Sequence, residues 1–162
     1  MMPAETTAGL KVGQRAPDFS LQDDAGKTVR LSDFTGKTLV LYFYPKDDTP
    51  GCTKESCAFR DGIAEIRAEG AEVFGVSVDS VDSHRKFKEK YRLNFSLLSD
   101  AEKTAVKAYG VWKEKSMYGR FFLGIERTTF VIDEAGRIAK IFPHVRVEGH
   151  VDEVLALVRR TQ

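Results

Sequence analysis

Hydrophobic residues follow two kinds of pattern along this chain, and the two patterns alternate. Nearly unbroken apolar runs at 39–44 and 72–79 predict buried strands. Apolar residues at three- and four-residue spacing across 53–69 predict an amphipathic helix, which Gly70 ends. The same criteria predict further strands at 19–22, 28–31, 95–99, 128–133 and 137–142, and further helices at 83–92, 100–109 and 150–160.

The order of these elements predicts the fold class. Strands 19–22 and 28–31 flank a polar turn at 23–27 and form an N-terminal β-hairpin, and strands 128–133 and 137–142 form a second hairpin. Between the two hairpins, strands and helices alternate, which is typical of an α/β layer fold. We therefore expect a central mixed β-sheet with helices on both faces.

Residues at the ends of these elements receive local predictions. Ser83 is expected to be the N-cap of the helix at 83–92, and Asp100 is expected to cap the next helix. The segment 113–120 is expected to be a solvated loop. Trp112, Phe121 and Phe122 are expected to pack in the core or near a functional site, and His84, His144 and His150 are expected at the surface.

Length and composition restrict the function classes. The 162 residues fit one domain spanning 1–162, with an N-terminal arm at 1–13. The 25 basic and 24 acidic side chains give a net charge of +1, which offers no footprint for nucleic acid or a membrane surface. The run at 39–44 is too short to cross a membrane. The first residues lack the charged and apolar regions of a signal peptide, so we expect a cytoplasmic protein.

The chain has two cysteines, Cys52 and Cys57, and both lie just after the buried strand at 39–44. In the cytoplasm a cysteine pair is more often catalytic or metal-binding than structural. The histidines show no metal-ligand spacing to the cysteines, so we expect no metal site and no cofactor. Redox chemistry is the favoured interpretation. Two alternatives remain open, namely Cys52 as a small apolar residue at a helix end and Cys57 as a buried core thiol.

The position of Cys52 favours a reactive thiol. A strand, a tight turn and a helix place it in or near the first helical turn, where unpaired N–H groups and the helix dipole favour negative charge. The thiolate is the reactive form of cysteine. Thr49 offers a hydroxyl that could hold the thiolate, orient a small oxygen substrate or cap the helix. Pro45 and Pro50 stiffen the loop.

Cys52 and Cys57 cannot form a disulfide while they share one helix. Residues at this spacing are separated by roughly 7.5 Å along the axis and point about 140° apart. A disulfide needs Cα atoms roughly 4.4–6.8 Å apart. Pro50-Gly51 and the weak helix formers that follow predict a two-state helix start, folded for attack and unwound for disulfide formation.

The motif Pro45-x-x-x-Thr49-x-x-Cys52 resembles the active-site motif of the peroxiredoxins, which are thiol peroxidases with a thioredoxin-like fold. The wider stretch 43–57 is similar to the bacterioferritin comigratory protein, or peroxiredoxin Q, branch of that family. The similarity covers nearly the whole chain, because further segments match that branch in order. These segments are Ala16-Pro-Asp-Phe19, Leu97-Leu-Ser-Asp100, Tyr109-Gly-Val-Trp112 and Arg127-Thr-Thr-Phe-Val-Ile-Asp133.

The resemblance implies a role for each matching residue. Cys52 matches the peroxidatic cysteine, which peroxide oxidises to sulfenic acid, and Cys57 matches the resolving cysteine of the subgroup that carries it in the same helix. Thr49 matches the hydroxyl that hydrogen-bonds the peroxide, and Arg127 matches the arginine over the thiolate. Pro45 matches the residue that shields the site from water, and Glu55 matches an acidic residue beside the arginine.

The same resemblance implies the reaction partners. These are a peroxide substrate and thioredoxin or another dithiol reductant, and an intrachain resolving cysteine favours a monomer. Taken without the cysteine motif, Arg127 before a strand would be assigned to a surface salt bridge. Two other functions remain open: a disulfide reductase, disfavoured by the Cys-x4-Cys spacing, and a non-enzymatic redox sensor or holdase. The preferred peroxide and the electron donor are not fixed by the sequence.

Overall fold

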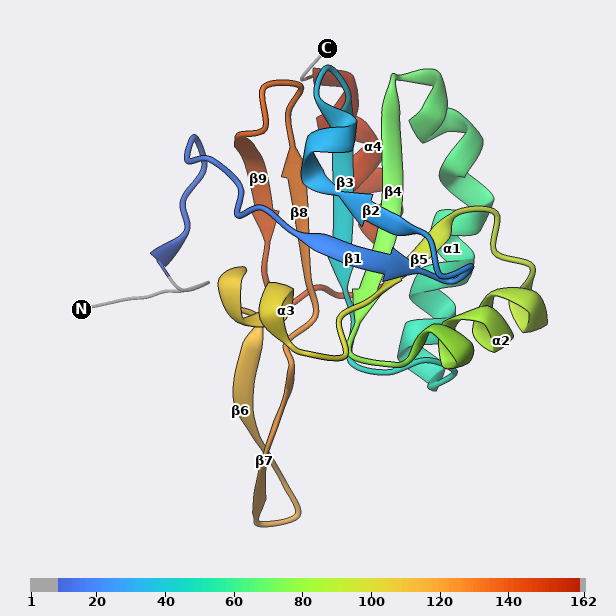
Figure 1. The fold of residues 1–162 in the computed structure, drawn as a ribbon, viewed down its shortest axis with the longest axis vertical. Coiled ribbons are helices and arrows are strands. Elements are labelled where there is room, and N and C mark those ends of the chain that lie inside the picture. The colour runs from blue at the N-terminus through green and yellow to red at the C-terminus, as the bar shows by residue number, and fades with distance from the viewer. Residues whose placement is uncertain (1–8, 161–162) are drawn as a thin grey trace.

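The computed structural model describes residues 9–160 and contains a seven-stranded sheet flanked by helices (Figure 1). In spatial order the strands are β2 (Thr28–Arg30), β1 (Ser20–Asp23), β5 (Ser96–Ser99), β4 (Ala71–Ser77), β3 (Thr38–Phe43), β8 (Thr128–Ile132) and β9 (Ile138–Phe142). The helices are α1 (Pro50–Ala68), α2 (Val81–Tyr91), α3 (Thr104–Ala108) and α4 (His150–Arg160), with a 3-10 turn η3 (Leu31–Phe34). Strands β6 (Trp112–Met117) and β7 (Arg120–Ile125) form a separate two-stranded sheet.

The sheet is mixed, as predicted. Strands β3, β4 and β5 run parallel to one another. Strand β8 pairs antiparallel with both β3 and β9, and β1 pairs antiparallel with both β2 and β5. The two expected hairpins, β1–β2 and β8–β9, are both present.

The central strand β3 divides the core into two halves. All six of its residues are buried, and their side chains alternate between the two faces of the sheet. Leu39, Leu41 and Phe43 join a cluster that includes residues of α3, while Val40 and Tyr42 join a cluster with residues of α1, α2 and α4. Helices therefore cover both faces, as expected, and the unbroken apolar run is explained by burial on both sides.

Helix α1 begins earlier than predicted. The apolar spacing suggested a start at residue 53, whereas the helix starts at Pro50 with Thr49 as the N-cap residue. Proline is favoured at the first helical position because its missing N–H would have no partner there. The buried face includes Phe59, Ile63 and Ile66, which were expected to face inward.

Two local predictions near α2 and α3 are wrong. Ser80, and not Ser83, is the N-cap of α2, and its hydroxyl oxygen accepts the N–H of Ser83 at 3.1 Å. Asp100 lies before α3 and is not its N-cap residue, which is Lys103. The Asp100 carboxylate still accepts the N–H of Val106 at 2.8 Å, so it supports the helix from outside.

The segment 113–120, expected to be a solvated loop, is instead most of the β6–β7 hairpin, which projects from the body of the molecule (Figure 1). Phe121 is 73% exposed and Phe122 is 43% exposed, so neither ring packs in the core. Trp112, at the base, is partly buried against the core. Three consecutive charged residues of β6, at 113–115, conceal the strand pattern, because this hairpin has no buried face along its length.

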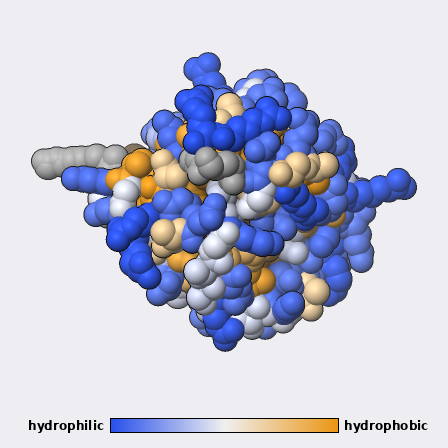
Figure 2. Space-filling model, turned by 90° about the horizontal axis from the view of Figure 1, so that it is seen from above, coloured by the Kyte–Doolittle hydropathy of each residue, from blue (hydrophilic) through white to orange (hydrophobic). Residues whose placement is uncertain are grey.

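The histidine prediction holds at one position of three. His144 is exposed, whereas His84 and His150 are 0% and 2% exposed. Residues 1–8 of the predicted N-terminal arm lie outside the described part of the chain. Within residues 9–160, no helix combines the length and apolar composition needed to cross a membrane. Seen from above, the surface is mostly hydrophilic, with hydrophobic side chains in small groups (Figure 2).

Candidate active site

Cys52 is the third residue of α1 and lies just beyond the end of β3. Its side chain is buried, at 1% exposure, within the core cluster that includes Tyr42, Tyr44 and Phe59. The helix opens with the N–H of Thr53 donating to the carbonyl of Thr49 at 2.8 Å, so Cys52 precedes the first donor used within the helix. The thiol thus occupies the helix N-terminus that the sequence predicted, where free N–H groups favour negative charge.

Arg127 brings a positive charge to the thiol from the other side. It lies immediately before β8, and its Nη2 donates to Cys52 Sγ at 3.3 Å. Its Nη1 donates to Glu55 Oε1 at 2.6 Å. Burial alone would lower the pKa of Arg127, but the charges of Glu55 and Cys52 outweigh this and raise it. The guanidinium therefore stays protonated and spans the two groups in a fixed fork.

Glu55 is an almost fully buried carboxyl group of the site. Its side chain is 1% exposed, and within the described residues its Oε2 has no hydrogen-bond partner. Burial raises the pKa of Glu55 to about 7, and the attraction of Arg127 opposes this only in part. The carboxyl is therefore held between its neutral and charged forms near neutral pH, while the arginine keeps its charge throughout.

Thr49 and Pro45 frame the loop between β3 and α1. Thr49 occupies the N-cap position of α1, but its side chain does not cap the helix. Its Oγ1 instead donates to the carbonyl of Lys46 at 2.9 Å, which leaves the oxygen able to accept a further hydrogen bond. Both Thr49 and Pro45 are partly buried. The structure thus brings Cys52, Thr49, Arg127 and Glu55 to one end of the sheet.

Cys57 lies on the same unbroken helix as Cys52. Both cysteines are free thiols, Cys52 buried and Cys57 partly buried. Because α1 is helical from Pro50 to Ala68, the two sulfur atoms point to different sides of the helix. A bond between them requires at least the first turns of α1 to unwind.

Two residues that were not predicted to be site residues also shape the site. A Cβ added at Gly51 would lie 3.2 Å from Arg127 Nη2, so the bare backbone at this position leaves room for the guanidinium. Lys115 on β6 lies within electrostatic reach of the same groups: burial, followed by the charge of Arg127, lowers its pKa. The Pro-Gly pair signalled a turn rather than a close approach, and Lys115 fell in a segment expected to be a loop.

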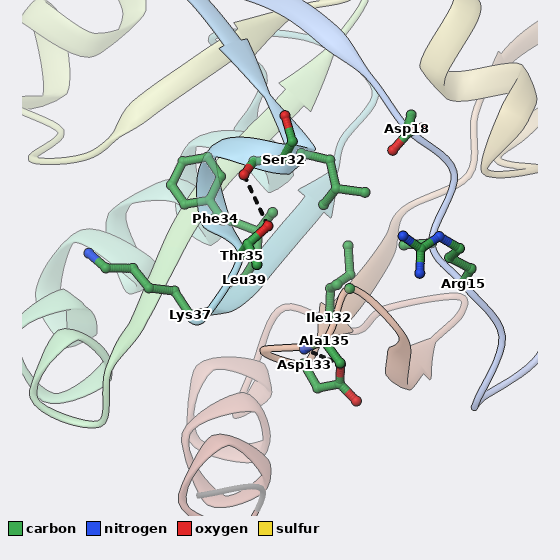
Figure 3. Close-up of a pocket in the computed structure, with 13 residues that line it drawn as sticks. Arg15, Asp18, Ser32, Phe34, Thr35, Lys37, Leu39, Ile132, Asp133 and Ala135 are labelled. Atoms are coloured by element: carbon green, nitrogen blue, oxygen red, sulfur yellow. Dashed lines mark hydrogen bonds between the residues drawn. The ribbon is translucent and has the colours of Figure 1, made fainter.

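A hollow of about 100 Å³ lies at the opposite end of β3, beside Leu39 (Figure 3). Arg15, Asp18 and Lys37 line it together with residues at the end of β8. None of the predicted site residues reaches it, and it contains no thiol. The chemistry predicted from the sequence therefore lies at the other end of the sheet.

A buried thiol at a helix N-terminus, held by an arginine from the segment just before a neighbouring strand, is the arrangement of a thiol peroxidase. The model of the AhpC/TSA family matches residues 12–141, so this chain belongs to that family. The similar proteins include Peroxiredoxin Bcp of Bacillus subtilis, 49% identical over 93% of this chain and 96% of that protein. Peroxiredoxin Bcp of Escherichia coli is 44% identical over 90% of this chain and 94% of that protein.

Solved structures agree with this assignment. The bacterioferritin comigratory protein of Xanthomonas campestris superposes with a TM-score of 0.87 at 40% identity, over 93% of this chain and 98% of that one. A cysteine-to-serine mutant of PrxQ from Xylella fastidiosa gives a TM-score of 0.89 at 39% identity, over 93% and 96%. The resemblance to the peroxiredoxin Q branch is thus confirmed, and the fold is that of the thioredoxin-like peroxiredoxins.

Proposed function

We propose that this protein is a thiol peroxidase that reduces hydrogen peroxide and organic hydroperoxides to water and alcohols. One observation carries the proposal: Arg127 Nη2 lies 3.3 Å from the Sγ of Cys52, which is buried at the start of α1. A cysteine that served only as a small apolar residue would gain nothing from a charged guanidinium. Peroxiredoxin relatives support the same activity.

In the first step, the Cys52 thiolate attacks the nearer oxygen of the peroxide. The S–O bond forms as the O–O bond breaks, which gives sulfenic acid on Cys52 and an alkoxide or hydroxide that takes up a proton. Arg127 and the free N–H groups at the start of α1 stabilise the negative charge that moves from sulfur to the leaving oxygen. Thr49 holds the peroxide through its hydroxyl oxygen, and Pro45 limits the access of water.

In the second step, the Cys57 sulfur attacks the sulfenic sulfur of Cys52, and water leaves as the disulfide forms. Support comes from the sequence, which has no other thiol, and from the weak start of α1, which must unwind for the sulfur atoms to meet. Thioredoxin or a similar dithiol then reduces the disulfide through a mixed disulfide. Glu55 orients Arg127 through this cycle.

We further propose that the chain acts as a single-domain monomer in the cytoplasm. An intrachain disulfide removes the need for a second subunit in the cycle. Organic hydroperoxides are included among the substrates because the Xanthomonas campestris relative has been studied for alkyl peroxide reduction activity. No feature of the described residues favours a redox sensor or a disulfide reductase over the peroxidase.

The test is mass analysis and peptide mapping after one equivalent of hydrogen peroxide, on the wild type and on Cys57→Ser. We expect a linked Cys52–Cys57 peptide in the wild type and sulfenic acid at Cys52 in the variant. An intermolecular disulfide or a stable sulfenic acid in the wild type would remove Cys57 from the cycle. A reduced Cys52 would contradict the peroxidase itself. Repeated turnover with a dithiol separates the enzyme from a sensor that oxidises once.

A further inference from the structure

The loop at 45–49 carries two consecutive aspartates, and side chains of α2 hold both of them. Asp48 Oδ2 accepts Lys90 Nζ at 2.8 Å, and its Oδ1 accepts the hydroxyl of Tyr91 at 2.7 Å. Asp48 also has a φ of 56°, a left-handed conformation that is uncommon outside glycine and that aspartate adopts more readily than most residues. A loop with such a backbone needs support from outside itself.

Asp47 is buried and makes more hydrogen bonds than Asp48. It is 8% exposed, and its N–H donates to Asp79 Oδ2 at 2.8 Å. Its Oδ1 accepts the hydroxyl of Tyr44 at 2.6 Å. Its Oδ2 accepts the hydroxyl of Ser83 at 2.8 Å and lies 2.7 Å from His84 Nδ1. The carboxylate thus joins the end of β3, the 45–49 loop and the first turn of α2.

The partners of His84 hold its ring in place on both sides. The ring is 0% exposed, and its Nε2 lies 2.9 Å from the carbonyl oxygen of Leu98. A carbonyl only accepts, so Nε2 must carry a proton. Nδ1 faces the Asp47 carboxyl group, so a proton between Nδ1 and Oδ2 joins the two side chains in a buried hydrogen bond.

Asp47, Asp79 and His84 each have one potential ligand atom within 4.8 Å of the others, which is the spacing of a metal site. Hydrogen bonds already account for these atoms. Asp79 Oδ2 accepts both the Asp47 N–H and the hydroxyl of Ser77 at 2.7 Å, and both ring nitrogens of His84 have hydrogen-bond partners. The cluster is a closed hydrogen-bond network and not an open set of ligands.

We propose that His84 and Asp47 are positioning residues for the peroxidase reaction. Their buried hydrogen bond holds the 45–49 loop against α2, so that the Thr49 hydroxyl and the first turn of α1 keep their places around Cys52. The inference rests on the proposed function. It concerns the placement of the peroxide rather than the formation of the thiolate, because neither residue contacts Cys52.

The test separates these two properties in a Cys57→Ser background, where only the first step is observed. Sulfenic acid formation by hydrogen peroxide needs both the thiolate and a correctly placed Thr49. Alkylation by iodoacetamide needs the thiolate alone. In His84→Gln we expect the peroxide rate constant to fall about tenfold or more, since small displacements of reacting groups are costly. Alkylation should change by less than about twofold.

Two controls sharpen the result. Lys86 lies on α2, is exposed and pairs with Asp82 rather than with the loop, so Lys86→Gln should leave both rates unchanged. Asp47→Asn should reproduce the selective loss, and the double variant should lose no more than the worse single variant, because the two residues act as a pair. Unchanged peroxide rates, or equal losses in both reactions, would overturn the positioning role.

One measurement needs no variant that could fail to fold. Heteronuclear NMR of the wild type should show a proton on His84 Nε2 and a hydrogen bond between Nδ1 and the Asp47 carboxyl group, and the absence of that hydrogen bond would overturn the positioning pair. Ser83→Ala removes one donor to Asp47 and should give a smaller loss in the same direction. If the wild type itself forms no sulfenic acid, the proposed function fails instead, which is a distinguishable result.

Discussion

The 45–49 loop and the β6–β7 hairpin lie towards the same end of the molecule, but they are stabilised in different ways (Figure 1). The loop is held by hydrogen bonds to α2 and to the end of β4. The hairpin packs into the core only at its base, through Trp112 and Ile125. Within residues 9–160, five of the six large hydrophobic side chains that are exposed belong to it, the sixth being Val12.

This difference indicates where the molecule requires precise placement. Around Cys52, charged groups must keep fixed separations, and burial there strengthens their interactions. The outer part of the hairpin contributes little burial, and a two-stranded hairpin alone is marginally stable. Substitutions should therefore have large effects near the loop and small effects along the hairpin.

The largest effect is expected for Arg127→Met. The variant keeps much of the side-chain volume but removes both the donor to Cys52 and the partner of Glu55. Loss of a preorganised donor to developing charge typically costs about 100- to 1000-fold in rate. We expect a fall of that size in the peroxide rate constant, measured by stopped-flow kinetics. Arg159→Met, which breaks an exposed ion pair of α4, is the control and should leave the peroxide rate constant unchanged. A loss of less than tenfold in Arg127→Met would contradict the assigned role of Arg127.

The second effect is the dependence of the free energy of unfolding on pH, which Glu55 dominates. Burial raises the pKa of Glu55 to about 7 in the folded state, above its usual 4.5. The folded protein therefore binds more protons than the unfolded chain between these values, and the free energy of unfolding falls as pH rises through them. The shift lowers the free energy of unfolding by on the order of 3 kcal/mol. This loss is fully present above pH 7 and absent below about pH 4.5.

Glu55→Gln should remove most of this pH dependence, because glutamine does not titrate. Urea unfolding at pH 5 and pH 8 measures it as the difference between wild type and variant, which cancels other titrating groups. The exposed Glu65→Gln serves as the control and should keep the wild-type slope. An unchanged slope in Glu55→Gln would show that the carboxyl titrates normally.

Much of this side of the molecule could be predicted from sequence. The unbroken apolar run of β3 and the helical spacing after it identify two buried elements, and the motif places Cys52 between them. The predicted start of α1 was a few residues too late, because Pro50, Gly51 and Cys52 add nothing to the apolar spacing that marks the helix. Helix boundaries depend on capping, and here Thr49 occupies the N-cap position without a side-chain cap bond.

The remaining errors have a common physical cause. His84 and His150 are polar residues whose burial depends on partners distant in sequence, such as Asp47 for His84, and local pattern does not show these. The hairpin pairs only with itself, so neither of its faces displays a buried alternation. Hydrophobic periodicity detects an element through its buried apolar face. A prediction from it is therefore wrong where the buried residues are polar or where the paired strands are exposed.

One glycine near the 45–49 loop and one in the hairpin allow the two regions to be compared by the same substitution. Gly51 has an ordinary helical backbone, but a Cβ there would lie 3.2 Å from Arg127 Nη2. Gly119 at the hairpin turn has open space around it but a φ of 77°. Alanine should thus displace the guanidinium by a few tenths of an ångström at the first position, whereas at the second it should strain only the turn.

We expect Gly51→Ala to lower the peroxide rate constant by up to about tenfold, a smaller loss than a full displacement of about 1 Å would give. Its stability should not fall, because alanine favours the helix. Gly119→Ala should keep the wild-type rate and lose up to about 1 kcal/mol of stability. Rates come from stopped-flow kinetics and stabilities from urea unfolding, and equal rates for the two variants would refute the close approach at Gly51.

The smallest effect is expected for Phe121→Ser on β7. The ring is 73% exposed, so its removal uncovers no core and leaves no cavity. Surface substitutions of this kind usually change the free energy of unfolding by less than about 0.5 kcal/mol. Phe130→Ser on β8, where the ring is fully buried against Phe43 and Tyr109, is the matched contrast and should cost at least about 3 kcal/mol. Urea unfolding of both variants measures the difference. A comparable loss at Phe121 would mean that its ring is buried in solution, and the contrast between a tightly held site and an open hairpin would then fail.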